Sequence, residues 1–415
     1  MKEPSYRPDG WDYALLFGGI IGIFLGLTAA LGLAGVALSG LIGGNHEAAL
    51  AGEWSATATL AMAALCLPAV FYGGGKVLGL AVGGKEKPSR RLLLLILLFP
   101  AALAAGHLAY EKGIVTGLLG PMSHFAAAGL PVLAAVVLLR RLGPAIPRRR
   151  AWGQFLAGLW LTPAGALTLE LITLIPVTAT LVIGLNSSVD VSALGEMMIS
   201  PDPLGSKEFE SVVRELILQP WVIVIILVYV AIMVPIVEET LKSIAVWPFL
   251  WHGLTPPEAF LGGALAGAGY AMFEAMFLTQ PGTAWVETMI ARVGATFVHV
   301  FTAGLSSWGL VEGFRYRRWS RCVLTVLTAF AIHGIWNASA VGIGLAVVAE
   351  QVGISEAATG VWPTIGGLGA LVLGTLGVVA FVGPIVVSRR LADARTGAAS
   401  ANPQVNPPAG PLAPS

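Results

Sequence analysis

Long apolar runs separated by short polar segments dominate this chain. Crossing ~30 Å of hydrocarbon takes about 20 apolar residues. We predict ten membrane spans at about 13–41, 56–76, 92–110, 115–139, 153–185, 221–250, 258–279, 285–313, 322–346 and 361–388. The first run is too long and too rich in glycine for a cleaved signal peptide, so we count it as a span. The pattern therefore predicts an all-α fold, a polytopic transmembrane helical bundle of about ten spans.

The composition agrees with a membrane protein. The chain is 56% hydrophobic and only 11% charged, with a mean hydropathy of +0.80, whereas a soluble domain carries roughly 25% charged residues. Cys66 and Cys322 both fall in apolar runs, which argues against a disulfide framework and against a cysteine-based zinc site. No basic patch is interleaved with aromatic residues, so we expect the lipid bilayer and no nucleic acid as a partner.

The basic residues predict the orientation. Most of the 24 Lys and Arg residues fall in the N-terminus, in alternate loops and in the tail, while the other loops hold Lys112, Lys207 and Arg214. The positive-inside rule then places both termini in the cytoplasm. We expect a multi-pass protein of the cell membrane, and specifically of a prokaryotic plasma membrane.

Three regions follow along the chain. Residues 1–150 form an N-terminal accessory region of four spans, and residues 151–390 form a second bundle. The long acidic outer loop 187–220 has an apolar helical face in its second half, which predicts a helix on the membrane surface. Residues 391–415 are rich in Ala, Pro and Gly without periodicity, so we predict a disordered tail.

Ionisable residues inside the second bundle are the candidates for function, because each costs at least ~2.5–3.5 kcal/mol at mid-membrane. Glu238 and Glu239 are adjacent in the sixth span, and Lys242 follows on the same helix face. Two neighbouring carboxylates at low dielectric do not both ionise readily, which suits a general acid or base. Pro235 lacks a backbone donor and should kink the span just before them.

Three further spans contribute polar residues. Glu274 ends the seventh span and is a peripheral candidate. Arg292 and His299 are seven residues apart in the eighth span, and His333 and Asn337 share one face of the ninth. Helix lengths place the Glu pair and both histidines in the middle third of the membrane.

This set of residues can hydrolyse a peptide bond without a covalent intermediate. A carboxylate beside an imidazole can deprotonate water, and a second His with an Asn can stabilise an oxyanion. A rhomboid-type GxSG motif and an HExxH zinc motif are absent, and no Asp lies inside a predicted span. We predict no cofactor, although zinc held by Glu239, His299 and His333 stays open on ligand type.

The same residues resemble a known family. The ordered motifs EExxK, FE, RxxxxxxH followed by FTA, and HxxWN, over 235–340, look like those of the PrsW intramembrane proteases, which are related to type II CAAX prenyl proteases and bacteriocin-processing proteins. The resemblance implies catalysis by Glu238, Glu239, His299, His333 and Asn337, with Lys242, Glu274 and Arg292 in support. It implies a membrane-anchored protein substrate, such as an anti-sigma factor cut at a first site.

Two other classes of protein also bury such residues. An ion- or proton-coupled transporter places Glu and His at mid-membrane, although paired broken helices in repeats are not evident here. A non-catalytic scaffold could keep the same fold and part of the polar set.

Overall fold

The computed structural model describes residues 8–111, 119–185, 214–216, 219–277, 284–354 and 360–401, and within them it is helical without strands. Ten candidate spans are long and apolar enough to cross a membrane in this part of the chain. They are Gly10–Ile42, Ala48–Val77, Arg90–Ala109, Leu119–Leu142, Arg148–Gly184, Pro220–Ala245, Pro256–Phe277, Trp285–Phe314, Trp319–Gln351 and Val361–Ala394. The predicted all-α bundle of ten spans is confirmed.

Several spans consist of more than one helical segment. The first half of the chain holds α1 (Gly10–Ile42), α2 (His46–Ala64), α3 (Leu67–Val77), η1 (Arg90–Leu98), α4 (Phe99–Glu111), α5 (Leu119–Leu142), α6 (Arg148–Leu156), η2 (Ala157–Leu161) and α7 (Thr162–Leu185). The second half holds α10 (Pro220–Val228), η3 (Tyr229–Met233), α11 (Val234–Lys242), η4 (Ser243–Ala245), η5 (Trp247–Phe249), α12 (Pro256–Phe277), α13 (Trp285–Phe314), α14 (Trp319–Gln351) and α15 (Val361–Ala401).

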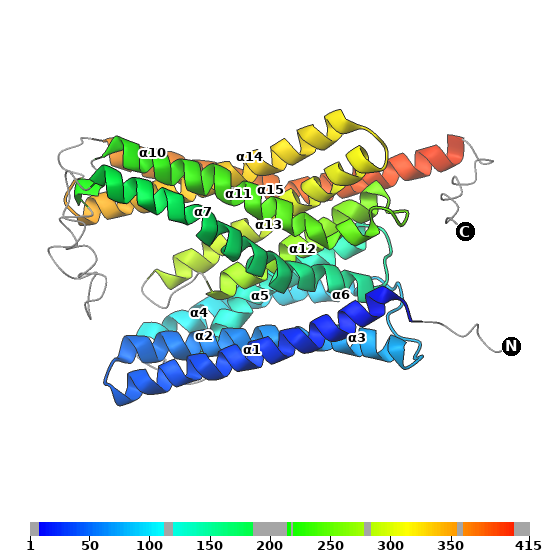
Figure 1. Cartoon of the computed structure of the whole chain (residues 1–415), viewed down its shortest axis with the longest axis horizontal. Coiled ribbons are helices and arrows are strands. Elements are labelled where there is room, and N and C mark those ends of the chain that lie inside the picture. Colours follow the sequence, from blue (N-terminus) through cyan, green and yellow to red (C-terminus); the bar gives the residue numbers. More distant parts are fainter. Residues whose placement is uncertain are drawn as a thin grey trace.

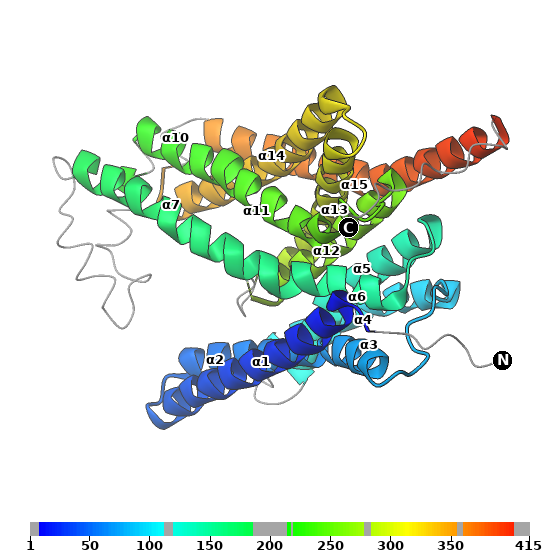
Figure 2. The same ribbon diagram turned by 45° about the vertical axis from the view of Figure 1, so that its right-hand side comes forward.

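The helices form two groups around a central pair. Helices α1 to α3 lie together along one side, and α7, α10, α11, α14 and α15 lie along the other (Figures 1 and 2). Between them α12 packs against α13, and α12 also contacts α5 and α6. Helix α1 begins and α15 ends at the same end of the bundle (Figure 1). Which end faces the cytoplasm stays a prediction.

Small residues let α12 occupy the centre. Its sequence PPEAFLGGALAGAGYAMFEAMF makes it the most enclosed of the candidate spans. A Cβ atom on Gly267 would overlap the carbonyl oxygen of His299, and one on Gly269 would overlap that of Phe155. Small residues allow backbones to approach this closely inside a membrane. The glycines of α12 therefore set the distance between α12 and the helix that carries His299.

We expect Gly267→Ala to destabilise the protein, because overpacking a tight helix contact costs ~1–3 kcal/mol. Thermal unfolding of the purified protein measures this as a lower Tm. Gly374→Ala on α15 is the matched control, since nothing lies within 4 Å of a Cβ added there. Equal Tm values for the two variants would contradict the close approach of α12 and α13.

Two details differ from the sequence interpretation. Helix α15 continues to Ala401, into the segment predicted to be disordered, because LADARTGAASA is rich in the strong helix former Ala. Helices α1 and α15 extend beyond the predicted spans and so include Asp12 and Asp393 near their ends; Asp12 closes a capping box with Asp9 and pairs with Arg149. Most of the acidic loop 187–220, with its predicted surface helix, lies outside the described residues.

Candidate active site

A local distortion of the sixth span prepares the site. Helix α10 passes into the π-helical turn η3, and α11 follows with Pro235 in its first turn. A π-helical bond would join the N–H of residue 235 to the carbonyl of Val230, but proline has no N–H. Asn337 Nδ2 on α14 donates to this Val230 oxygen at 3.1 Å. The side chain of Asn337 thus connects α14 to the backbone just before the Glu pair.

The last turns of α11 bury a lysine between two carboxylates. Glu238 and Glu239 are 3% and 0% exposed, and Lys242 is 0% exposed. Lys242 Nζ donates to Glu238 Oε2 at 2.8 Å and to Glu239 Oε1 at 2.9 Å. Pairing makes each of these charges tolerable in a low-dielectric setting.

Helix α13 brings His299 to the same place. Its Nδ1 lies 2.8 Å from Lys242 Nζ, and its Nε2 lies 2.5 Å from Glu274 Oε2 on α12. Arg292 Nη1, two turns earlier on α13, donates to the same Glu274 oxygen at 3.2 Å. Glu274 therefore orients the His299 imidazole from one side, and Arg292 balances the negative charge of Glu274.

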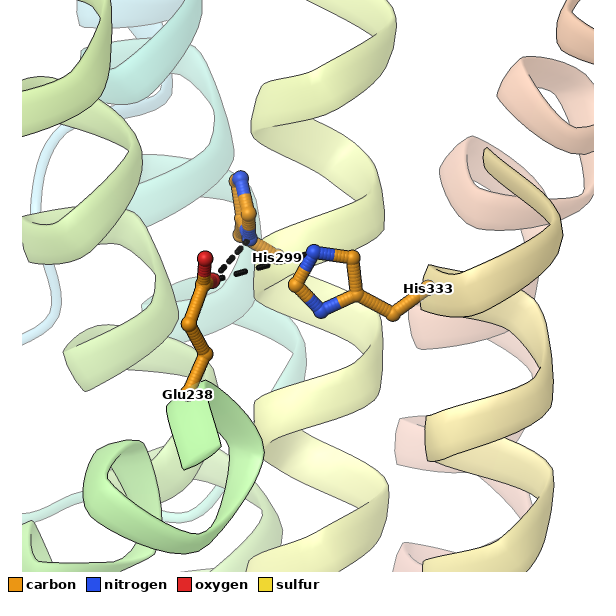
Figure 3. Close-up of side chains that lie close together, drawn as sticks. All are labelled: Glu238, His299 and His333. Atoms are coloured by element: carbon orange, nitrogen blue, oxygen red, sulfur yellow. Dashed lines mark ion pairs between the residues drawn. The ribbon is translucent and has the colours of Figure 1, made fainter. Parts of the chain in front are cut away.

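Helix α14 supplies the second imidazole. His333 is 1% exposed, and its Nδ1 lies 2.8 Å from Glu239 Oε1. The opposite nitrogen, Nε2, lies 3.7 Å from Glu238 Oε2, and His299 Nδ1 lies 4.0 Å from that same oxygen. Figure 3 shows Glu238, His299 and His333 converging from three different helices.

Each imidazole has a carboxylate behind it. An N–H directed at Glu274 or Glu239 fixes the tautomer, so the other ring nitrogen is an acceptor. Nδ1 of His299 accepts from Lys242 Nζ, and Nε2 of His333 lies on the side of Glu238. One ligand atom from each of Glu238, His299 and His333 lies within 4.8 Å of the others. Two His and one Glu with carboxylates behind the imidazoles form a donor set of the kind that holds catalytic zinc. The residues therefore fit a zinc ion.

The charges also favour a cation at this point. Two buried carboxylates, Glu238 and Glu239, and the partly buried Glu274 face two fixed cations, Lys242 and Arg292. The Lys242 ammonium occupies the position between Glu238 and His299. Lys242 and a metal ion would thus compete for the same donors.

The structure brings together most of the residues that the sequence singled out. Glu274, a peripheral candidate from the sequence, contacts His299 directly. The metal group contains Glu238, whereas the sequence alternative named Glu239, which lies behind His333. The Asn337 amide donates a hydrogen bond to the Val230 carbonyl. In the structure this contact positions the backbone just before the Glu pair.

Sequence reasoning missed Tyr270. Its ring lies 4.3 Å from Lys242 Nζ, and its centroid is 5.2 Å from that of His299. The available signal was its position one turn before Glu274, on the same face of α12. A cation–π contact with Tyr270 helps hold the buried ammonium in place.

Comparison with known proteins points to the same segment. The model of the PrsW family intramembrane metalloproteases matches residues 206–364, which include every site residue from Glu238 to Asn337. Over residues 206–364 the chain is similar to this family. None of the curated proteins and none of the solved structures compared with the chain matches it. The PrsW match supports a membrane peptidase, while the relation to CAAX prenyl proteases stays a prediction.

Proposed function

We propose that this chain is an intramembrane endopeptidase that hydrolyses a peptide bond of a membrane-anchored protein. The observation that carries the proposal is the convergence of Glu238, His299 and His333, with a carboxylate behind each imidazole. The PrsW match supports the peptidase class. A single-span protein is the proposed substrate, and an anti-sigma factor cut at a first site is the instance that the family suggests.

The chemistry follows from the atoms that face one another. A water bound to Glu238 Oε2 is also near His299 Nδ1 and His333 Nε2, which orient it. Glu238 takes a proton from this water as its oxygen attacks the scissile carbonyl carbon. The same proton then passes to the leaving nitrogen as the C–N bond breaks. The Lys242 ammonium lies beside the Glu238 carboxylate and stabilises the negative charge that develops on the oxygen of the attacked carbonyl.

A zinc ion would be held by Glu238, His299 and His333. Such an ion would supply Lewis-acid chemistry, which lowers the pKa of a bound water and polarises a carbonyl. Glu239 and Glu274 would then orient the two imidazoles, as their hydrogen bonds already do.

The regions of the chain divide these tasks. We propose residues 151–390 as the catalytic bundle and residues 1–150 as an accessory region. The accessory spans are joined to the catalytic ones by buried contacts: His124 on α5 accepts a hydrogen bond from Trp285 of α13 and lies 3.2 Å from the Met276 carbonyl oxygen of α12.

Incubation of the detergent-purified protein with single-span substrates tests the proposal. We expect a cleaved fragment with the wild-type protein and none with His299→Ala. His252→Ala is the matched control, because His252 is exposed and outside the site. A His299→Ala variant that cleaves at the wild-type rate would overturn the assignment. Ion flux in proteoliposomes without cleavage of any substrate would instead indicate a transporter.

A further inference from the structure

An apolar cavity of ≈ 500 Å³ lies between the accessory spans and α12, outside the catalytic cluster. Helix α5 forms one wall and α6 and α12 form others, and α12 contacts both α5 and α6 (Figure 2). Representative lining residues are Phe125, Gly129, Arg140, Phe155, Leu265 and Met272. Arg140 is the one charged residue in the lining, at the end of α5.

The size of the cavity selects its occupant. From Phe125 to Arg140 the cavity follows α5 for about 22 Å at 1.5 Å per residue, more than one leaflet of ~15 Å. A transmembrane helix ~10 Å wide and ~30 Å long fills on the order of 2,500 Å³, which excludes a substrate helix. A volume near 500 Å³ suits a small ligand, and a long, apolar, membrane-facing shape suits an acyl chain.

The mouth of the cavity is basic. Pro88 and Leu92 line the cavity at the end where Arg140 lies, and the exposed Arg90 and Arg91 stand between Pro88 and Leu92 in the sequence. Arg140 Nη2 is held there by the carbonyl oxygens of Glu86 and Ile146, at 3.3 and 3.1 Å.

The loops around this mouth are rich in cations. Within 79–91 and 140–150 Glu86 is the single acidic residue, and it pairs with Arg148. Lys87 and Arg141 tie the two loops together, because each donates to a backbone carbonyl of the other loop. A ligand whose polar headgroup lies at this mouth should carry negative charge on that headgroup.

We propose that this cavity binds an anionic phospholipid, with an acyl chain along α5 and the phosphate at Arg90, Arg91 and Arg140. Charge complementarity at the mouth and the length of the apolar wall together define this class of ligand. The bound lipid would fill the space between the accessory region and α12, the helix that carries Tyr270 and Glu274. This proposal does not depend on proteolysis.

Lipid binding to the full-length purified protein tests it. Native mass spectrometry from mixed micelles compares phosphatidylglycerol with phosphatidylcholine of identical acyl chains. We expect phosphatidylglycerol to bind roughly tenfold or more tightly, since each basic residue near an anionic headgroup contributes to attraction. Equal retention of the two lipids would overturn the anionic headgroup.

Two variants separate binding of the acyl chain from recognition of the headgroup. A Cβ on Gly129 meets only Met272, at 3.7 Å and beyond, so Gly129→Leu fills the cavity and should abolish binding of both lipids there. The control Gly374→Leu adds the same side chain where nothing lies within 4 Å. Arg90→Gln with Arg91→Gln should remove the preference for phosphatidylglycerol while leaving chain binding. Unchanged binding in Gly129→Leu would show that the lipids are bound elsewhere on the protein.

Discussion

Substituting Glu238 by Gln is expected to abolish cleavage of a single-span substrate, with a loss of ~10³-fold or more in rate. Glu238 Oε2 is the atom that faces Lys242 Nζ, His299 and His333 at once. A neutral amide can neither accept the proton of water nor serve as an anionic ligand. The measurement is the rate of fragment release by the purified variant, normalised to folded protein.

Glu239→Gln separates the two adjacent carboxylates. Glu239 contacts the far side of His333, so its loss should reduce the rate ~10–100-fold, as for groups that orient a reacting side chain. Glu287→Gln, an exposed site in the first turn of α13, should leave the rate unchanged. A Glu239→Gln loss as large as that of Glu238→Gln would assign proton transfer to Glu239, whose Oε2 is buried without a hydrogen-bond partner.

The spans were predictable because a bilayer imposes a simple length rule on apolar segments. Their internal breaks were not. Hydropathy does not distinguish an α-helical turn from the π-helical turns at Tyr229–Met233 and Ala157–Leu161. Pro235 signalled a distortion at the first of these turns, and its consequence required a partner, Asn337, more than 100 residues away in the chain. Composition favoured disorder from residue 391, but the Ala-rich sequence extends α15 to Ala401, and residues 402–415 lie outside the described part of the chain.

The members of the site were predictable, but their roles were not. Burial cost identifies Glu and His in a span, whatever they contact. Lys242 and His299 are 57 residues apart, and Glu239 and His333 are 94 apart, so sequence spacing could not show that they touch. Close ligand spacing in the chain was therefore a poor test for a metal site. Side-chain direction decided that Glu238 faces both imidazoles while Glu239 lies behind one of them.

The role of Lys242 distinguishes a metal-dependent site from a metal-free one. Its ammonium neutralises Glu238 and Glu239 while standing where a metal ion would bind. Lys242→Met keeps most of the side-chain volume and removes the charge. We expect it to lower the free energy of unfolding by ~3–5 kcal/mol, because two carboxylates then remain buried without their cation. Thermal or denaturant unfolding of the purified variant measures this.

Zinc should rescue this variant if the donor set holds a metal. A ligand that binds only the folded state raises Tm with its concentration, so added zinc should raise the Tm of Lys242→Met more than that of the wild type. Lys85→Met, at an exposed position, is the matched control and should show neither loss nor rescue. The double variant Glu238→Gln with Lys242→Met should regain stability without zinc and lose the response to it, because one carboxylate and one ligand are gone together. A Lys242→Met variant that is destabilised but indifferent to zinc would assign the site to metal-free hydrolysis, with Lys242 as its permanent cation.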